Sequence, residues 1–382
     1  MFEPGTETEL VDAVLSALAD GRKLAIRGGG SKAAVGRNVD ATVLSTRQMT
    51  GIIDYDPAEL ILTVRPSTPL ADVEAAIGER GQMLAFEPFD HGPLFGTAKG
   101  MATIGGVVAA GVAGSRRVTA GGARDHLLGF RAVSGRGESF IAGAKVVKNV
   151  TGYDLPKLAA GSWGRLFVLA EMTLKVLPRP EMSRSLAIAG LAPEQARQAM
   201  AAASGSHAEV AATAHVPGRL CGGESLTLFR LEGFDPSVAA RAIMLQTLLA
   251  DVGAVRELDE AESAGLWDGI RTLDLLPQDH VIWRINIPPR ALAAIVDVLE
   301  PLGARWFADW AGGLIWTSFD GDPAVVREAA QRAGGHAMLL RAPEAVRAVV
   351  PCFHPQSEGL AALEQRVRRA FDPLSLFETG RF

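Results

Sequence analysis

Cysteine is scarce in this chain: among 382 residues only Cys221 and Cys352 occur, far apart in the sequence. Because neither belongs to a C-x-x-C pair, the chain by itself has no disulfide framework, no iron–sulfur cluster and no cysteine-rich zinc site. The histidines form no H-x-x-H or H-x-x-x-H pair either. No metal site is therefore predicted.

Long apolar runs and an excess of basic charge are also missing. The longest apolar candidate, Met101 to Ala113, is short and interrupted by glycines, so no transmembrane helix is predicted. The acidic start MFEPGTETEL lacks the basic and apolar regions of a secretory signal. The formal net charge is −5 with both signs interspersed, which argues against nucleic acid as a partner. We expect a soluble cytoplasmic protein.

Glycine, by contrast, is concentrated between Gly96 and Gly122, where it alternates with small apolar residues. Glycine at high density is costly for a packed element. The stretch is therefore either a flexible linker or a loop whose backbone N–H groups approach a ligand, and its valines favour a ligand. An earlier loop, Arg27 to Lys32 (RGGGSK), follows a short strand and combines free N–H groups with a cation. It is an anion cradle or a plain tight turn.

The length predicts two or three domains. In the N-terminal half, Thr6 and Glu9 form a capping box before a helix, and Thr68 is predicted to cap a second helix with Pro69 at its first position. From Ser183 to about Arg347, strands alternate with amphipathic helices at short spacing. This pattern predicts an α+β domain with two β-α-β units side by side, although no internal sequence repeat is evident.

Several landmarks occur in one order: RGGGSK, STPL at Ser67–Leu70, ATIGGVVAAGVAG, GGARD at Gly121–Asp125, KNVTGYDLPKL and GSWG. Together they resemble the FAD-binding domain of the vanillyl-alcohol-oxidase (PCMH) flavoprotein family, and the tail FDPLSLFETGRF is similar to that family's closing segment. More narrowly, VKNVTGYDL, Ile282–Arg284, the run Asp309–Trp316 and the segment Ala333–His336 resemble the E-type FAD-binding subunits of bacterial glycolate oxidase.

The resemblance implies a fold and a function. The fold is a two-subdomain PCMH-type FAD-binding domain over residues 1–180, a smaller α+β cap domain over 181–349, and a segment 350–382 that packs back on the FAD domain. The function is that of a subunit in a glycolate (2-hydroxy acid) oxidase complex. A larger FAD-dependent catalytic subunit and an iron–sulfur subunit would be its partners, and any membrane association would be peripheral, through them.

The resemblance also assigns residues to the cofactor. They are Arg27, Gly28, Gly29, Gly30, Ser31 and Lys32 in a first pyrophosphate loop, Ser67 and Thr68 in a second loop, Thr103, Ile104, Gly105, Gly106, Gly111 and Gly114 beside the flavin and pyrophosphate, Val168 near the adenine, and Arg381 of the closing segment. Relatives with covalent flavin often have a histidine after the glycines, where Ser31 and Lys32 stand here. Dissociable, non-covalent FAD is therefore expected.

The catalytic residues are not evident, because the paired histidines of catalytic relatives are absent. His336, Arg284 and Arg341 are the candidates, the arginines as receptors for a carboxylate. Two alternatives to the complex subunit stay open: a non-catalytic scaffold that docks a separate flavoprotein, and a stand-alone FAD-dependent D-2-hydroxy acid dehydrogenase. Valine at Gly29 or Gly105 is expected to abolish FAD retention by blocking backbone approach to the diphosphate.

Overall fold

The computed structural model describes residues 1–144 and 153–382, and the chain divides into two compact units. The first unit comprises Met1–Gly114, Gly121–Arg179 and Pro355–Phe382, and the second comprises Ser115–Ala120 and Pro180–His354. Part of the KNVTGYDL landmark falls between residues 145 and 152 and lies outside the described residues. No sequence pattern had indicated that the short segment Ser115–Ala120 belongs with the second unit.

The first unit is built on an antiparallel five-stranded sheet in the order β3-β4-β8-β6-β7. Its strands are β3 (Ile52–Asp56), β4 (Ile61–Val64), β6 (Leu127–Ser134), β7 (Ser139–Gly143) and β8 (Phe167–Lys175). Two small pairs accompany it: parallel β1 (Leu24–Arg27) and β2 (Thr42–Ser45), and antiparallel β5 (Gln82–Met83) and β9 (Leu177–Pro178). The helices are α1 (Glu7–Ala19), α2 (Leu70–Gly78), η1 (Pro93–Phe95), α3 (Ile104–Ala110), α5 (Ala123–His126), α6 (Leu155–Ala159) and α14 (Glu358–Phe371).

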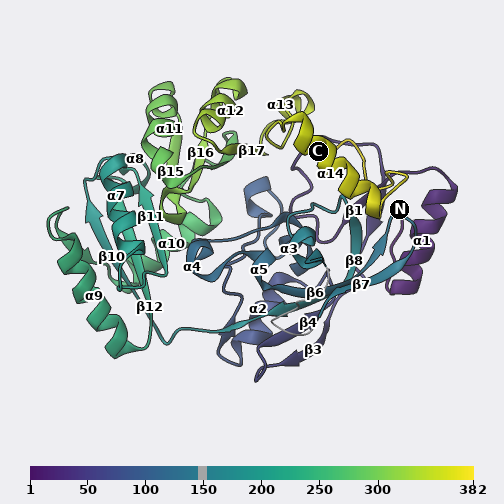
Figure 1. Ribbon diagram of the computed structural model, residues 1–382, viewed down its shortest axis with the longest axis horizontal. Helices are drawn as coiled ribbons and strands as arrows, with labels where there is room; N and C mark the ends of the chain where they lie inside the picture. Colours follow the sequence, from purple (N-terminus) through teal and green to yellow (C-terminus); the bar gives the residue numbers. More distant parts are fainter. Residues whose placement is uncertain (145–152) are drawn as a thin grey trace. The chain divides into compact units, whose positions relative to one another are not determined.

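The two ends of the chain meet in the core of the first unit. Leu10 and Val14 of α1 pack with Leu24 of β1 and with Leu376 and Phe377 of the C-terminal tail. The Leu24 amide also donates a hydrogen bond to the Leu376 carbonyl oxygen (2.9 Å). Figure 1 shows α14, in yellow, returning towards β1 and the purple helix α1. The tail is therefore placed where it can reach the loop that follows β1.

Thr68 does not cap helix α2 as predicted. The helix begins at Leu70, and Pro69 is its N-cap residue, without a side-chain hydrogen bond. The Thr68 hydroxyl oxygen instead accepts from the Gly51 amide (2.9 Å), and the hydroxyl donates to the Arg65 carbonyl (2.8 Å). Because these two bonds already satisfy the buried hydroxyl of Thr68, the hydroxyl is not free to cap the helix.

The second unit contains an antiparallel eight-stranded sheet in the order β13-β10-β12-β11-β15-β16-β14-β17. Its strands are β10 (Met182–Ala189), β11 (Ala212–Val216), β12 (Leu226–Gly233), β13 (Val255–Glu257), β14 (Ile282–Asn286), β15 (Arg305–Asp309), β16 (Leu314–Ser318) and β17 (His336–Arg341). The helices are α4 (Arg117–Ala120), α7 (Pro193–Ser204), α8 (Gly218–Cys221), α9 (Asp235–Leu249), α10 (Glu260–Thr272), α11 (Leu292–Leu299), α12 (Pro323–Arg332) and α13 (Glu344–Val349), with the 3-10 turns η2 (Pro289–Ala291), η3 (Glu300–Leu302) and η4 (Trp310–Gly312).

The chain order of these elements reveals a structural repeat. The series β10-α7-β11-β12-α9-β13 and the series β14-α11-β15-β16-α12-β17 are both β-α-β-β-α-β units, and each forms four adjacent strands of the sheet. Strands β11 and β15 join the two halves. The units are thus larger than the predicted β-α-β units, and each has the split β-α-β arrangement of ferredoxin-like folds.

The two faces of this sheet differ in chemistry. Trp283 and Ile285 of β14 pack into a core with residues of helices α7, α9, α11 and α12. Because successive side chains of a strand point to opposite faces, Arg284 and Asn286 lie on the other face. We call this second face the polar face.

Candidate cofactor site

A cleft in the first unit follows the loop predicted to be an anion cradle. It holds about 900 Å³ of empty space, counting the part that is open to solvent. Loop residues Arg27 to Lys32, helix α3, strand β8 and the C-terminal Arg381 all contribute to its wall. Concave sites lined by small residues and a few polar groups are typical of cofactor binding.

Most predicted cofactor residues meet at this cleft. The lining includes Arg27, Gly28, Gly29, Gly30, Ser31, Lys32, Thr103, Gly105, Gly106, Val168 and Arg381. Segments far apart in the sequence are therefore brought to one place. The assignment of individual residues to the cofactor stays a prediction.

Five predicted residues do not line the cleft. Ile104 is fully buried, and the Ser67 hydroxyl lies 2.8 Å from the Thr46 hydroxyl. Thr68 is held in its turn, as described above. Gly111 ends helix α3 with a left-handed φ of 63°, and the Gly114 amide donates to Phe86 (2.9 Å). Because their side chains or amides already make contacts within the protein, these five residues support the loops behind the wall and do not form its surface.

Other lining residues were not predicted from the sequence: Ile26, Ala33, Thr46, Pro66, Ala109, Ala110, Ser162, Trp163, Gly164, Phe167 and Leu169. The GSWG run was recognised as a landmark without a role. Its Trp163 amide donates to the Ala109 carbonyl (2.8 Å), which places this turn against the end of helix α3. The landmark was the one signal that could have indicated this part of the wall.

The glycines of the wall are needed for packing of the chain against itself. A Cβ atom on Gly29 would lie 1.7 Å from the Met101 carbonyl oxygen, and one on Gly105 would lie 2.6 Å from the Pro66 carbonyl oxygen. The Gly105 amide also donates to that Pro66 oxygen (2.8 Å). The sequence predicted that these two glycines allow the backbone to approach a diphosphate, and this reason is therefore incomplete. Valine at either position would disturb the fold before it met any ligand.

Lys32 carries an unpaired charge in the wall of the cleft. Only 9% of the residue is exposed, and its Nζ atom has no hydrogen-bond partner among the described residues. Burial lowers the pKa of Lys32 to about 8, although the negative charge of Asp90 opposes that change. A buried ammonium without a partner is unfavourable by itself. A phosphate group in the cleft would supply the missing acceptor, so the site fits the diphosphate of FAD.

Arg381 supports the same loop from the C-terminal tail. Its guanidinium donates to the carbonyl oxygens of Lys32 (2.5 Å), Ala33 (3.1 Å) and Val35 (2.8 Å). Glu378 of the same tail forms an ion pair with Arg368. The closing segment is thus bound to the protein and fixes the loop after the glycines.

The three catalytic candidates all lie in the second unit. Arg341 donates to the carbonyl oxygens of Pro277 (2.9 Å) and His280 (2.9 Å), so it braces a loop. His336 is exposed at the start of β17, and partial desolvation and the positive charges of Arg284 and His354 lower the pKa of its imidazole. Among the described residues, no group of three or more His, Cys, Asp or Glu side chains is arranged to hold a metal ion.

Comparisons with known proteins identify the fold and the cofactor. The family model for an FAD binding domain matches residues 1–143. The structure of p-cresol methylhydroxylase superposes with a TM-score of 0.72 at 13% identity, over 99% of this chain and 87% of that one. The chain therefore has the PCMH-type FAD-binding fold, which confirms the predicted fold class and cofactor.

Similarity along the whole chain is more specific. The glycolate oxidase subunit GlcE of Escherichia coli (strain K12) is 34% identical over 374 residues, which are 97% of this chain and 96% of that protein. This chain belongs to the GlcE family, as the resemblance predicted. The glycolate oxidase subunit GlcD of Bacillus subtilis (strain 168) is 31% identical over 144 residues, 38% of this chain and 29% of GlcD. No helix within the described part of the chain is long and apolar enough to cross a membrane.

Proposed function

We propose that this chain is the FAD-binding subunit of a multi-subunit enzyme that oxidises glycolate or a similar 2-hydroxy acid. The observation that carries the proposal is the buried ammonium of Lys32 in the wall of a cleft, which has no hydrogen-bond partner within residues 1–144 and 153–382. The similarity to GlcE over nearly the whole chain supports the choice of enzyme.

The residues of the cleft would hold FAD without a covalent bond. Neither histidine nor cysteine is among the lining residues. Lys32 would pair with the diphosphate, and small residues such as Gly106 would leave room for its approach. Bound FAD would supply two-electron acceptance followed by onward electron transfer. Arg381 would keep the loop in place by holding its carbonyl oxygens.

Partners are needed for the complete reaction. The two cysteines of the chain cannot hold an iron–sulfur cluster. The relative GlcE is itself a subunit of glycolate oxidase. We therefore infer a larger FAD-dependent catalytic subunit and an iron–sulfur subunit as partners, in the cytoplasm or at the inner face of the membrane through those partners.

The test is to co-express the chain with its neighbouring subunits and to purify it with and without them. The expected product is yellow, releases FAD on heating, and retains the larger flavoprotein in a pull-down. A colourless chain in the presence of its partners would favour a scaffold without flavin. Turnover of glycolate or D-lactate by the isolated chain with an artificial dye would show instead a stand-alone dehydrogenase.

A further inference from the structure

Helix α9 of the second unit has an exposed apolar face as well as a buried one. The residues of its buried face, which pack into the core on the side of the sheet opposite the polar face, are Val238, Ala242, Leu245 and Leu249. On the other side of the helix, Ile243 is 65% exposed, Met244 45% and Leu248 44%. A helix that is apolar all round is normally covered all round.

The exposed residues form one continuous surface. They recur at the spacing i, i+3, i+4, i+7 and i+8, and they are Ala240, Ile243, Met244, Thr247 and Leu248. We call these five residues the outward face of α9. The hydroxyl of Thr247 is used within the helix, because it donates to the Ile243 carbonyl oxygen (3.0 Å). Phe234, the N-cap residue, and Val252, beyond the end of the helix, are exposed apolar residues as well.

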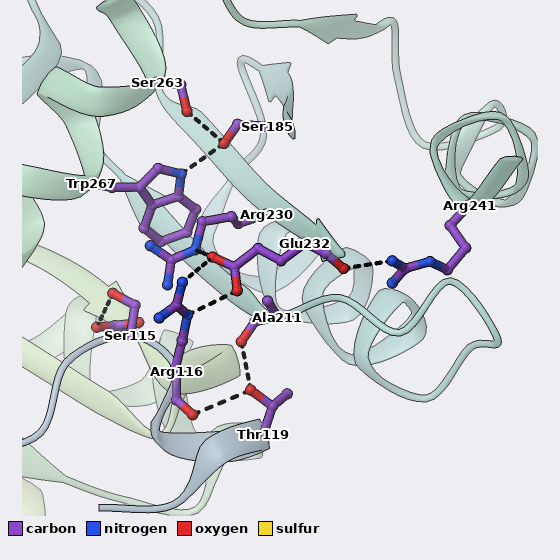
Figure 2. Close-up of polar contacts among 11 residues, drawn as sticks. Ser115, Arg116, Thr119, Ser185, Ala211, Arg230, Glu232, Arg241, Ser263 and Trp267 are labelled. Carbon is purple, nitrogen blue, oxygen red and sulfur yellow. Dashed lines mark hydrogen bonds and ion pairs between the residues drawn. The ribbon is translucent and has the colours of Figure 1, made fainter. Parts of the chain in front are cut away.

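The outward face carries no charge, because the one basic residue of α9 is turned towards the protein. The Arg241 guanidinium donates to the carbonyl oxygens of Glu232 (2.6 Å) and Glu209 (3.2 Å). Figure 2 shows the bond to Glu232. Single exposed apolar residues are common on protein surfaces, whereas a contiguous apolar patch marks a contact site. The centres of protein–protein contacts are likewise poor in charge and rich in methionine and aromatic residues.

An acidic residue lies at each end of α9. Asp235 is its first residue, and Asp251 follows its last residue by two positions. Asp235 forms an ion pair with Arg184 (3.1 Å), so this arginine is already used. Asp251 is exposed and forms no ion pair with any residue in 1–144 or 153–382. The apolar surface is therefore flanked by negative charge.

These charges discriminate between possible occupants of the outward face. In an antiparallel pair of two α9 helices centred on Met244, Asp251 of one copy would lie near Asp235 of the other, and the two carboxylates would repel each other. Helices that lie on membranes present Lys or Arg beside the apolar face, whereas α9 has no lysine and its arginine is turned inward. A different protein with basic groups opposite the two acids fits better than a second copy or a membrane.

We propose that the outward face of α9 docks another subunit of the enzyme complex, through a surface that is apolar at its centre and basic at its ends. The proposal rests on the proposed function for the existence of that subunit. Met244 and Leu248 lie in the middle of the outward face, where buried side chains contribute most to affinity. The two acids at the ends would steer the association.

The test is a pull-down of the tagged full chain after co-expression with its neighbouring subunits, with FAD content measured on the same samples. The double variant Met244→Glu with Leu248→Glu places two charges at the centre of the contact, so the amount of retained subunit per chain should fall at least tenfold. FAD content should stay unchanged, because neither residue lines the cofactor cleft. Val349→Glu is the matched control, at an exposed apolar position of helix α13 in the same unit, and it should retain the subunits as wild type does.

A charge reversal tests the ends of the contact. Asp251→Lys removes an acid that has no ion-pair partner in the described part of the chain, so the fold should be unaffected. Retention of the subunits should be lower than for wild type at low salt, and this difference should disappear at high salt because exposed charges are then screened. Stronger retention by Asp251→Lys would contradict a basic partner surface.

Other outcomes separate this proposal from the proposed function. Equal retention by wild type and by the double variant would overturn the docking surface and leave the FAD assignment intact. Dimerisation of the isolated chain in size-exclusion chromatography, or flotation with phosphatidylglycerol vesicles, would overturn it too if the double variant abolished either. FAD-free wild type that still retains its subunits through Met244 and Leu248 would contradict the proposed function and support this surface. Wild type that retains no subunit would contradict both.

Discussion

Lys32→Met should change cofactor affinity and stability in opposite directions. In the FAD-free protein, Lys32 is a buried cation without a hydrogen-bond partner among the described residues. Methionine has a similar length and no charge, so it removes the cost of burying that cation. With FAD bound, the same change removes a partner of the diphosphate. A residue that only supported the fold would not produce this combination.

The magnitude follows from the pKa of Lys32, which lies at about 8 instead of its usual 10.5. One pKa unit is worth about 1.4 kcal/mol, so burial of the charged form costs about 3 kcal/mol at pH 7. Because the pKa is lowered on folding, the cost is present below pH 8 and disappears as the pH rises towards 10.5. A hydrogen bond to a charged group contributes about 1.5–3 kcal/mol, which predicts a ten- to hundredfold loss of FAD affinity.

Two measurements check this prediction. Urea unfolding of the FAD-free proteins should show Lys32→Met to be more stable than wild type at pH 7, and this difference should shrink by pH 10. Fluorescence titration should show weaker FAD binding. Lys99→Met, at an exposed position in the same unit, serves as the control. Unchanged FAD affinity together with a lower stability of the FAD-free variant would refute the assignment of Lys32 to the diphosphate.

Two further changes test the cleft and the ion pair that holds the segment Ser115–Ala120. Gly106→Ala replaces a glycine inside helix α3, where a Cβ atom would meet only the Thr103 hydroxyl at 3.2 Å; it should keep the fold and weaken FAD binding about tenfold, and unaltered FAD fluorescence titration would exclude Gly106 from the contact. Glu232→Gln removes the carboxylate that pairs with Arg116 and Arg230. The Glu232 side chain is only 11% exposed. The substitution should lower the free energy of unfolding by about 3–5 kcal/mol, whereas Glu262→Gln in an exposed pair should lower it by less than about 1 kcal/mol in the same urea assay.

Local sequence patterns predicted many elements of the fold. The capping threonine Thr6 accepts from the Glu9 amide (3.2 Å) at the start of α1, because this contact needs only neighbouring residues. Strands and helices also alternate after Ser183, as the sequence pattern predicted. The hydrogen bond that diverts the Thr68 hydroxyl from the helix was not predictable, since the amide of Gly51 lies 17 residues away in the sequence.

The doubled β-α-β-β-α-β unit shows a second limit. Strand and helix order was visible in the sequence, whereas the pairing of β11 with β15, which joins the halves, depends on contacts between distant residues. Membership of Ser115–Ala120 in the second unit has the same origin. Its anchor, Arg116 with Glu232, joins residues 116 positions apart, and no local pattern records such a partner.

The sequence by itself determined the family, the cofactor and the loop that follows β1, because ordered glycine motifs and a lysine after them are local features. Only the tertiary structure decided what those residues do. It showed that Gly29 and Gly105 lie directly against the chain's own backbone, and that Lys32 is buried without a hydrogen-bond partner in the part of the chain that the structure describes. It also turned the Arg241 guanidinium inward and left the outward face of α9 exposed. Burial and the absence of a counter-charge depend on what surrounds a side chain, and distant parts of the chain supply those surroundings.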